Sequence, residues 1–254
     1  MGTLFLVATP IGNLEDITLR AVAVLRQAVL IAAEDTRQTK KLLVRYNIDT
    51  PLISYHEHNK LSRVGNVLEA LSGGDVALVS DAGTPGLNDP GYELVRAALE
   101  AGFAVSPVPG PSAPVAALVA SGLPTDSFLY LGYLPRRGAE RRARLAEISA
   151  LPYTLIFLET PHRLLEALAD LEAQLGDRKI AVARELTKLH EQIFRGTVRQ
   201  AVEYFTENEP RGEFTLVISG ADRASQKTWS EQRLLEELRG GLKSGQPASR
   251  LSNE

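Results

Sequence analysis

Short apolar segments typical of strands alternate with amphipathic segments typical of helices along most of this 254-residue chain. Residues 3–8, 76–79 and 155–158 are strand-like, whereas residues 19–28 and 163–175 have helical spacing. Consecutive strands joined by helices form βαβ units, whose strands run parallel. The sequence therefore predicts an α/β protein built on mostly parallel sheets.

One break in this pattern indicates two domains. A Gly-Leu-Pro-Thr segment at residues 122–125 ends one helical pattern and precedes a new series of strands and helices. We expect an N-terminal α/β domain over residues 1–121 and a C-terminal α/β domain over residues 122–222. With 44% apolar residues, each has enough material for its own core. Residues 223–254 are polar and are expected to form a helical tail that ends incompletely.

Composition excludes several classes of protein. No apolar stretch reaches the roughly 20 residues that a membrane span needs, and no basic and apolar leader is present. The chain has no cysteine, which excludes disulfides, thiolate catalysis and thiolate metal sites. A formal net charge of −3 means that any nucleic-acid contact must come from a local basic patch. We expect a cytoplasmic protein.

Four Gly/Pro loops, each directly after a strand-like segment, are the clearest sign of a ligand site. They span residues 7–14, 80–91, 108–113 and 158–163. Open α/β sheets bind ligands at the carboxyl ends of their strands, and glycine lets the backbone approach closely. Asp81 either contacts the ligand or caps its own turn, and Ser112 is an N-cap, a ligand contact or both. These loops predict a cleft for a ligand with a nucleoside or a charged end.

Charged and histidine-containing segments suggest further contacts. His56 and His58 share a face if their segment is extended, but no suitable third ligand accompanies them, so we expect a polar substrate rim and no metal. Charges also follow two strands near residues 159–163 and 184–188, where they form either an ion-pair network or substrate contacts. Five arginines lie within one short segment. They form either a solvated helix face or a phosphate-binding patch beside tyrosines. They are Arg136, Arg137, Arg141, Arg142 and Arg144.

A set of ordered segments resembles the tetrapyrrole methylase superfamily, and within it the branch that methylates ribosomal RNA. The segments are VATPIGNLEDITLRA, AEDTRQTKKLL, SYHEHN, SDAGTPGLNDPG, VPGPSA, PTDSFLYLGYLPRR, FLETPHRL, ARELTKLHEQIFRGT and GEFTLVISG. The most specific are SYHEHN, ETPHR and ARELTK. Two features depart from the family pattern. Gly86 replaces a commonly bulkier apolar residue, and the C-terminal helical extension is cut short after Leu251.

The resemblance implies a class III methyltransferase fold with S-adenosylmethionine bound between two α/β domains, and a homodimer. The implied substrate is a cytidine ribose 2′-hydroxyl in the decoding region of 16S ribosomal RNA, free or in the small ribosomal subunit. The expected cofactor contacts, carried over by motif position, are Pro10, Ile11, Asp81, Gly83, Thr84, Leu87, Ser112, Ala113, Leu158, Ala183 and Thr215. The expected RNA contacts are Arg136, Arg137, Arg141, Arg142, His56 and His58.

A ribose hydroxyl is a weak nucleophile, so a nearby base is expected to assist the reaction. We expect this base to be Glu185 or Glu159, with Arg163 and Lys188 positioning a phosphate or the hydroxyl. Two other functions remain open. One is methylation of a tetrapyrrole carbon on the same fold, and the other is a non-catalytic, ribosome-associated nucleotide-binding module whose charged pairs are structural.

Overall fold

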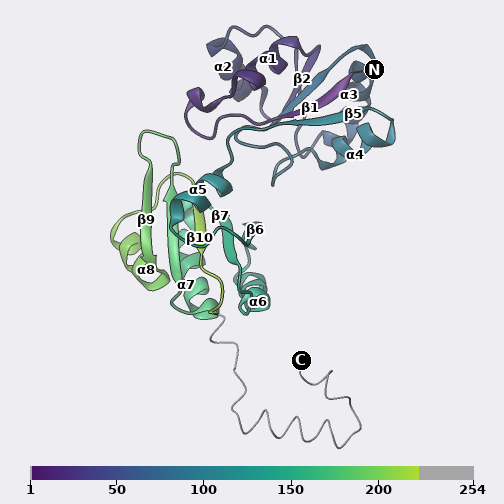
Figure 1. The fold of residues 1–254 in the computed structure, drawn as a ribbon. Helices are drawn as coiled ribbons and strands as arrows, with labels where there is room; N and C mark the ends of the chain where they lie inside the picture. The colour runs from purple at the N-terminus through teal and green to yellow at the C-terminus, as the bar shows by residue number, and fades with distance from the viewer. Residues whose placement is uncertain (1, 223–254) are drawn as a thin grey trace, which may run out of the picture.

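The computed structural model describes residues 2–222, so the predicted tail at residues 223–254 lies outside the described residues. Figure 1 shows two lobes, each built on a five-stranded sheet. The N-terminal sheet has the order β3-β2-β4-β1-β5, and all its pairings are parallel, as predicted. Its strands are β1 (Thr3–Val7), β2 (Leu30–Ala33), β3 (Leu52–Ser54), β4 (Val76–Val79) and β5 (Ala104–Val108).

Helices cover both faces of the N-terminal sheet. On one face, α1 (Leu19–Gln27) and α2 (Thr36–Arg45) bury apolar side chains such as Leu25 and Leu42. On the other face, α3 (Lys60–Gly73) and α4 (Tyr92–Glu100) bury side chains such as Leu71 and Leu94. The loops after the strands stay free at the carboxyl edge of the sheet, where a ligand can reach them.

The C-terminal sheet is mixed and has the order β6-β7-β10-β8-β9. Its strands are β6 (Phe128–Tyr133), β7 (Thr154–Glu159), β8 (Lys179–Arg184), β9 (Gln192–Thr197) and β10 (Phe214–Ile218). Only β6 and β7 pair in parallel, whereas β10 runs antiparallel to β7 and β8, and β9 runs antiparallel to β8. Strand β9 was not predicted from the sequence. A short loop joins β8 to β9, and a connection that short permits only antiparallel pairing.

Helix α5 (Ala113–Ser121) packs on the C-terminal sheet, although the sequence placed it in the first domain. Its Ala117 and Leu118 contact Ala183 and Val217 of that sheet. The other face is covered by α6 (Gly138–Ile148), α7 (Leu164–Leu175) and α8 (Val198–Glu207). The chain thus passes from the first sheet to the second before α5, as Figure 1 shows. The expected boundary after residue 121 lies at the end of α5, one helix after this crossing. None of the described helices is long and apolar enough to cross a membrane.

Arg141 holds α6 to α7 through a buried ion pair. Its side chain is 4% exposed, its Nε donates to Asp170 Oδ2 at 2.6 Å, and its Nη2 donates to Glu166 Oε2 at 3.3 Å. The prediction that Arg141 contacts RNA is therefore wrong, because its guanidinium is enclosed between two helices. Arg136, Arg137 and Arg142 are exposed.

Replacing Arg141 with Ala is expected to lower the free energy of unfolding by about 1.5–3 kcal/mol, because the partly buried Asp170 would lose its shortest charged hydrogen bond and keep only the 3.5 Å contact with Arg142. Urea denaturation of the two proteins measures this difference. The matched variant Arg137→Ala, on the exposed face of the same segment, should change stability by no more than about 0.5 kcal/mol. Equal losses of stability in the two variants would show that the ion pair between α6 and α7 contributes no more to stability than an exposed arginine does.

Candidate functional site

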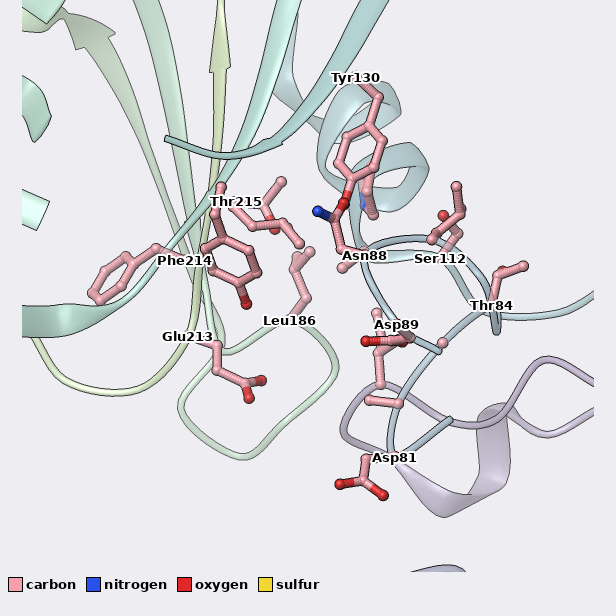
Figure 2. A pocket seen from close by; sticks show the side chains of 18 of the residues that line it. Asp81, Thr84, Asn88, Asp89, Ser112, Tyr130, Leu186, Glu213, Phe214 and Thr215 are labelled. Carbon is pink, nitrogen blue, oxygen red and sulfur yellow. The ribbon is translucent and has the colours of Figure 1, made fainter. Parts of the chain in front are cut away.

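A cavity of about 250 Å³ lies between the two lobes. In Figure 2, Asp81, Asp89 and Ser112 of the N-terminal side lie across from Glu213 and Thr215 of the C-terminal lobe. Every residue predicted to contact a cofactor lines this cavity except Pro10, which lines a neighbouring one. The structure thus brings together residues from six separate segments, and their role as cofactor contacts stays a prediction.

Backbone pairing between two loops shapes the N-terminal wall. Thr9 N donates to Gly83 O at 2.8 Å, and Gly83 N donates to Thr9 O at 3.0 Å. Gly83 has a φ of +77°, and an added Cβ there would lie 3.3 Å from Ile11 Cγ2. Glycine at this position therefore lets the loop after β4 close against the loop after β1. The pairing places Ile11 and Asp81 side by side in the cavity wall.

Close contacts between the lobes set the width of the cleft. An added Cβ on Gly12 would lie 2.5 Å from Lys188 Cγ, and Asn13 N donates to Thr187 Oγ1 at 3.0 Å. The loop between β8 and β9 thus reaches up to the N-terminal lobe, as Figure 1 shows. Elsewhere along the cleft, an added Cβ on Gly132 of β6 would lie 2.5 Å from Asn88 Nδ2. Neither glycine leaves room for a side chain at these contacts.

Among the described residues, every charged side chain that lines the first cavity is acidic. They are Glu34, Asp81, Asp89, Glu159 and Glu213. Burial raises the pKa of Asp89 to about 6, and the nearby charges of Glu34 and Asp81 add to this effect. Burial also raises the pKa of Glu34, against a hydrogen bond from the backbone of Asp81. A cavity with this charge favours a cationic ligand, such as a sulfonium or an amine.

The two carboxylates predicted as the base occupy different environments. Glu159 lines the cavity, its side chain is fully buried, and its Oε1 accepts from Thr160 N at 2.8 Å. Its Oε2 lies 3.3 Å from Arg163 Nη2 without hydrogen-bond geometry and has no other partner. Arg163 instead donates to the backbone oxygens of Leu134 and Pro135. Burial raises the pKa of Glu159 despite the nearby arginine.

Glu185 lines neither cavity, and its side chain is held by two groups of its own lobe. Its Oε1 accepts from Lys188 Nζ at 2.7 Å and from Glu213 N at 3.0 Å. Burial would raise the pKa of Glu185, but these hydrogen bonds and the charges of Lys188 and Arg184 lower it. Glu185 and Thr187 also have left-handed backbones, with φ of 51° and 64°. For a β-branched residue such as Thr187 this is a strained conformation, which persists where surrounding contacts demand it.

A second cavity of about 420 Å³ adjoins the first, and the two share Ile11, Asp81, Ala82 and Glu213. Its other lining residues come from the loop after β1, from α2, from Ser80 after β4 and from Lys188. His56 and His58 line neither cavity; their rings lie 6.0 Å apart, and His56 Nδ1 is buried without a partner. No cluster of groups suited to a metal ion occurs among residues 2–222.

Sequence reasoning missed several residues of the first cavity. They are Glu34, Asn88, Asp89, Tyr130, Tyr133 and Glu213. Glu213 precedes β10. Because β10 runs antiparallel to β7 and β8, its start lies at the edge of the sheet where those two strands end. A search limited to residues that follow strands could not find it. Asp89 was within reach, because it lies inside the loop at residues 80–91.

The raised pKa of Asp89 makes stability depend on pH. An aspartate whose folded pKa is about 6, against an ordinary 3.8, stabilises the folded state fully below the lower value and loses this effect as pH rises through 6. Asp89→Asn imitates the protonated form. We expect equal stability of the two proteins near pH 4 and an advantage of roughly 1–2 kcal/mol for the variant near pH 7, a value reduced for water in the open cavity.

Urea denaturation of the wild type and the Asp89→Asn variant at several pH values measures this difference, and Glu69→Gln, an exposed carboxylate on α3, is the control. A difference between Asp89→Asn and the wild type that stays constant with pH would contradict the assigned pKa.

Known proteins with similar sequences and folds support a common family. The model of the Tetrapyrrole (Corrin/Porphyrin) Methylases matches residues 3–202. A protein of Synechocystis sp. named ribosomal RNA small subunit methyltransferase I is 51% identical over 100% of this chain and 92% of its own length. A protein of Halalkalibacterium halodurans with the same name is 53% identical over 86% of this chain and 76% of its own.

Among solved structures, uroporphyrin-III C-methyl transferase from Thermus thermophilus, in complex with S-adenosyl homocysteine, has a TM-score of 0.59. It is 20% identical and covers 86% of this chain and 97% of its own. At this identity the likeness shows the fold alone.

Proposed function

The chain belongs to the tetrapyrrole methylase family, and we propose that it transfers a methyl group from S-adenosylmethionine to small-subunit ribosomal RNA. The acceptor is the 2′-hydroxyl of a cytidine ribose in the decoding region of 16S ribosomal RNA. The observation that carries this proposal is 51% identity, over the whole chain, to a protein named as a methyltransferase of that RNA. The tetrapyrrole enzyme with a similar fold is only 20% identical, which favours RNA over a tetrapyrrole as substrate.

The first cavity has the chemistry that the cofactor needs. Its carboxylates complement a molecule with a sulfonium and an ammonium group. Apolar side chains such as Ile11, Leu87 and Leu158 offer a surface for an adenine ring. Gly83 lets the backbone approach closely, and the hydroxyls of Thr84 and Ser112 lie on the same wall. When bound, the cofactor supplies a methyl group that is activated by the positive sulfur.

The residues of the cleft contribute mainly by holding the reacting atoms in line. Transfer of a methyl group to a ribose oxygen would need donor and acceptor in line, so alignment by these residues would supply much of the rate. Glu159 accepts the proton of the 2′-hydroxyl on Oε2, the buried oxygen that has no hydrogen-bond partner. Glu185 orients Lys188 through their 2.7 Å hydrogen bond, and Arg163 lies beside Glu159.

The remaining partners follow from the family. We propose a homodimer, as the resemblance implies, and a cytoplasmic location, as expected from the composition. The exposed Val115 and Val119 of α5 offer apolar surface for self-association, and light scattering measures the mass in solution. Arg136, Arg137 and Arg142 stay proposed RNA contacts, together with His56 and His58, although Arg137 and Arg142 each already pair with a carboxylate.

Incubation with labelled S-adenosylmethionine and small ribosomal subunits that lack the modification tests the function, and mapping then locates the methylated nucleotide. Label on a cytidine ribose of 16S ribosomal RNA is the expected result. Transfer to a tetrapyrrole instead would support the alternative enzyme. Tight cofactor binding without transfer to either substrate would support a non-catalytic module.

The role of Asp81 in cofactor binding is tested by Asp81→Asn. Asparagine keeps an oxygen that can accept from Asp35 N, now at 2.9 Å, but it removes the charge. Loss of one charge-assisted contact of about 1.5–3 kcal/mol should weaken S-adenosylmethionine binding more than about tenfold in calorimetry. Asp49→Asn, at an exposed residue outside both cavities, should bind normally. Equal affinity of the two variants would exclude Asp81 as a cofactor ligand.

The choice of base is tested by Glu159→Gln and Glu185→Gln in single-turnover methylation. The first should lower the rate about 10²-fold or more with unchanged cofactor affinity, and the second less than about tenfold. Only the ionised Glu159 accepts a proton, so the wild-type rate should fall as pH drops through its raised pKa. Glu159→Gln should lack this acid limb. A larger loss in Glu185→Gln would assign the base to Glu185. Small losses in both variants would mean that alignment of the reacting atoms, without a base, accounts for the rate.

A further inference from the structure

The second cavity differs from the first in the charge of its walls. Lys41 of α2 and Lys188 of the β8–β9 loop line it beside the shared carboxylates Asp81 and Glu213, together with polar Gln38 and Thr39. No lysine or arginine of the described chain lines the first cavity. At about 420 Å³, the second cavity falls in the roughly 300–1,000 Å³ range of ligand pockets. Lys188 Nζ is bonded to the carboxylates of Glu185 and Glu213, so Lys41 is the cation suited to a phosphate. The amide and hydroxyl groups suit the polar edge of a base.

Helix α2 extends this positive charge along the surface. Its ten residues include Arg37, Lys40, Lys41 and Arg45 and no Asp or Glu. Arg37, Lys40 and Lys41 are spaced at i, i+3 and i+4, which places them on one side of the helix. All four cations are exposed, and in the described part of the chain the carboxylate bonded to them is Asp35 at the helix N-cap, which binds Arg37. Lys41 donates to the amide oxygen of Gln38 at 2.6 Å.

The arginines of α6 have a different environment. Arg137 pairs with Glu140, Arg144 pairs with Glu147, and Arg142 shares Asp170 with the buried Arg141. Carboxylates therefore neutralise much of the α6 charge within its own lobe. Fewer of the α2 cations are bonded to carboxylates of the described chain, so they are available to a binding partner. Helix α2 also borders a cavity that adjoins the proposed cofactor site.

We propose that α2 binds the phosphate backbone of the substrate RNA and that the second cavity receives the target nucleotide. This inference rests on the proposed function. Lys40 and Lys41 contact phosphates, and the nucleotide enters beside Gln38 and Lys188. Its ribose then reaches the first cavity past the shared wall of Ile11, Asp81 and Glu213. The acidic first cavity repels phosphates, so the two cavities sort the cationic methyl donor from the anionic acceptor.

The double variant Lys40→Glu/Lys41→Glu tests the surface by salt-dependent binding to protein-free 16S ribosomal RNA fragments. Loss of two phosphate contacts should weaken binding about tenfold or more and reduce the log–log salt slope by about 1.4. Cofactor affinity in calorimetry should stay within about twofold, because neither lysine lines the first cavity. Arg96→Glu/Arg199→Glu makes the same change of charge on α4 and α8, which line neither cavity, and should bind RNA normally.

Equal RNA binding by the two double variants would overturn the inference. Loss of binding to whole subunits with unchanged affinity for protein-free RNA would also overturn it, because α2 would then contact a ribosomal protein.

Measurements of methylation distinguish a failure of this inference from a failure of the proposed function. A wild type that binds RNA through α2 but transfers no methyl group would contradict only the function. Normal methylation by Lys40→Glu/Lys41→Glu, with an unchanged KM for RNA, would contradict only the inference.

The cavity itself is tested by Gln38→Trp, which places an indole at its rim. Gln38 is exposed, so the fold should tolerate the change, and thermal unfolding checks this. We expect single-turnover methylation to fall more than about tenfold while cofactor affinity stays unchanged, because the ring blocks the nucleotide alone. Full methylation would overturn the placement of the nucleotide. Weakened cofactor binding would overturn it as well, since the cofactor would then extend into this cavity.

Discussion

The paired backbone hydrogen bonds between Thr9 and Gly83 are the contact on which the arrangement of both cavities depends. They join the loop after β1 to the loop after β4 and carry Ile11, Asp81 and Ala82 into the wall that the cavities share. The left-handed φ of Gly83 makes this approach feasible. Two loops separated by more than 70 residues thereby act as one rigid partition between neighbouring sites.

The cavities on the two sides of this partition differ in the charge of their walls. Carboxylates supply the charge of the first cavity, whereas the second combines the shared Asp81 and Glu213 with Lys41 and Lys188. Charges in partly enclosed sites interact more strongly than in bulk water, so the first cavity attracts cations and Lys41 gives the second a contact for an anion. A methyltransferase that acts on RNA must bring a cationic donor and a polyanionic acceptor to the same point. The observed distribution of charge allows both to approach without competing for one site.

Similar runs of basic residues have different roles in the two lobes. Arg141 and its neighbours on α6 meet carboxylates of α7 and of their own helix, and one of them is buried. The basic residues of α2 are exposed, and Asp35 at the helix N-cap is bonded to Arg37. Both segments contain several Lys or Arg residues in the sequence. Only the identity of the packed neighbour decides whether such a cation stabilises the fold or is available to a ligand.

Local patterns in the sequence determined the α/β class, most of the strands and helices, and the loops that form the cleft. These features are encoded within a few residues, through hydrophobic period and turn chemistry. The tertiary structure decided the antiparallel strands β9 and β10, the arrival of Glu213 at the cleft, the packing of α5 on the second sheet and the burial of Arg141. It also separated Glu159 from Glu185, which look alike in the sequence. These outcomes depend on contacts between segments far apart in the chain, and no local pattern specifies which distant segment will be the partner.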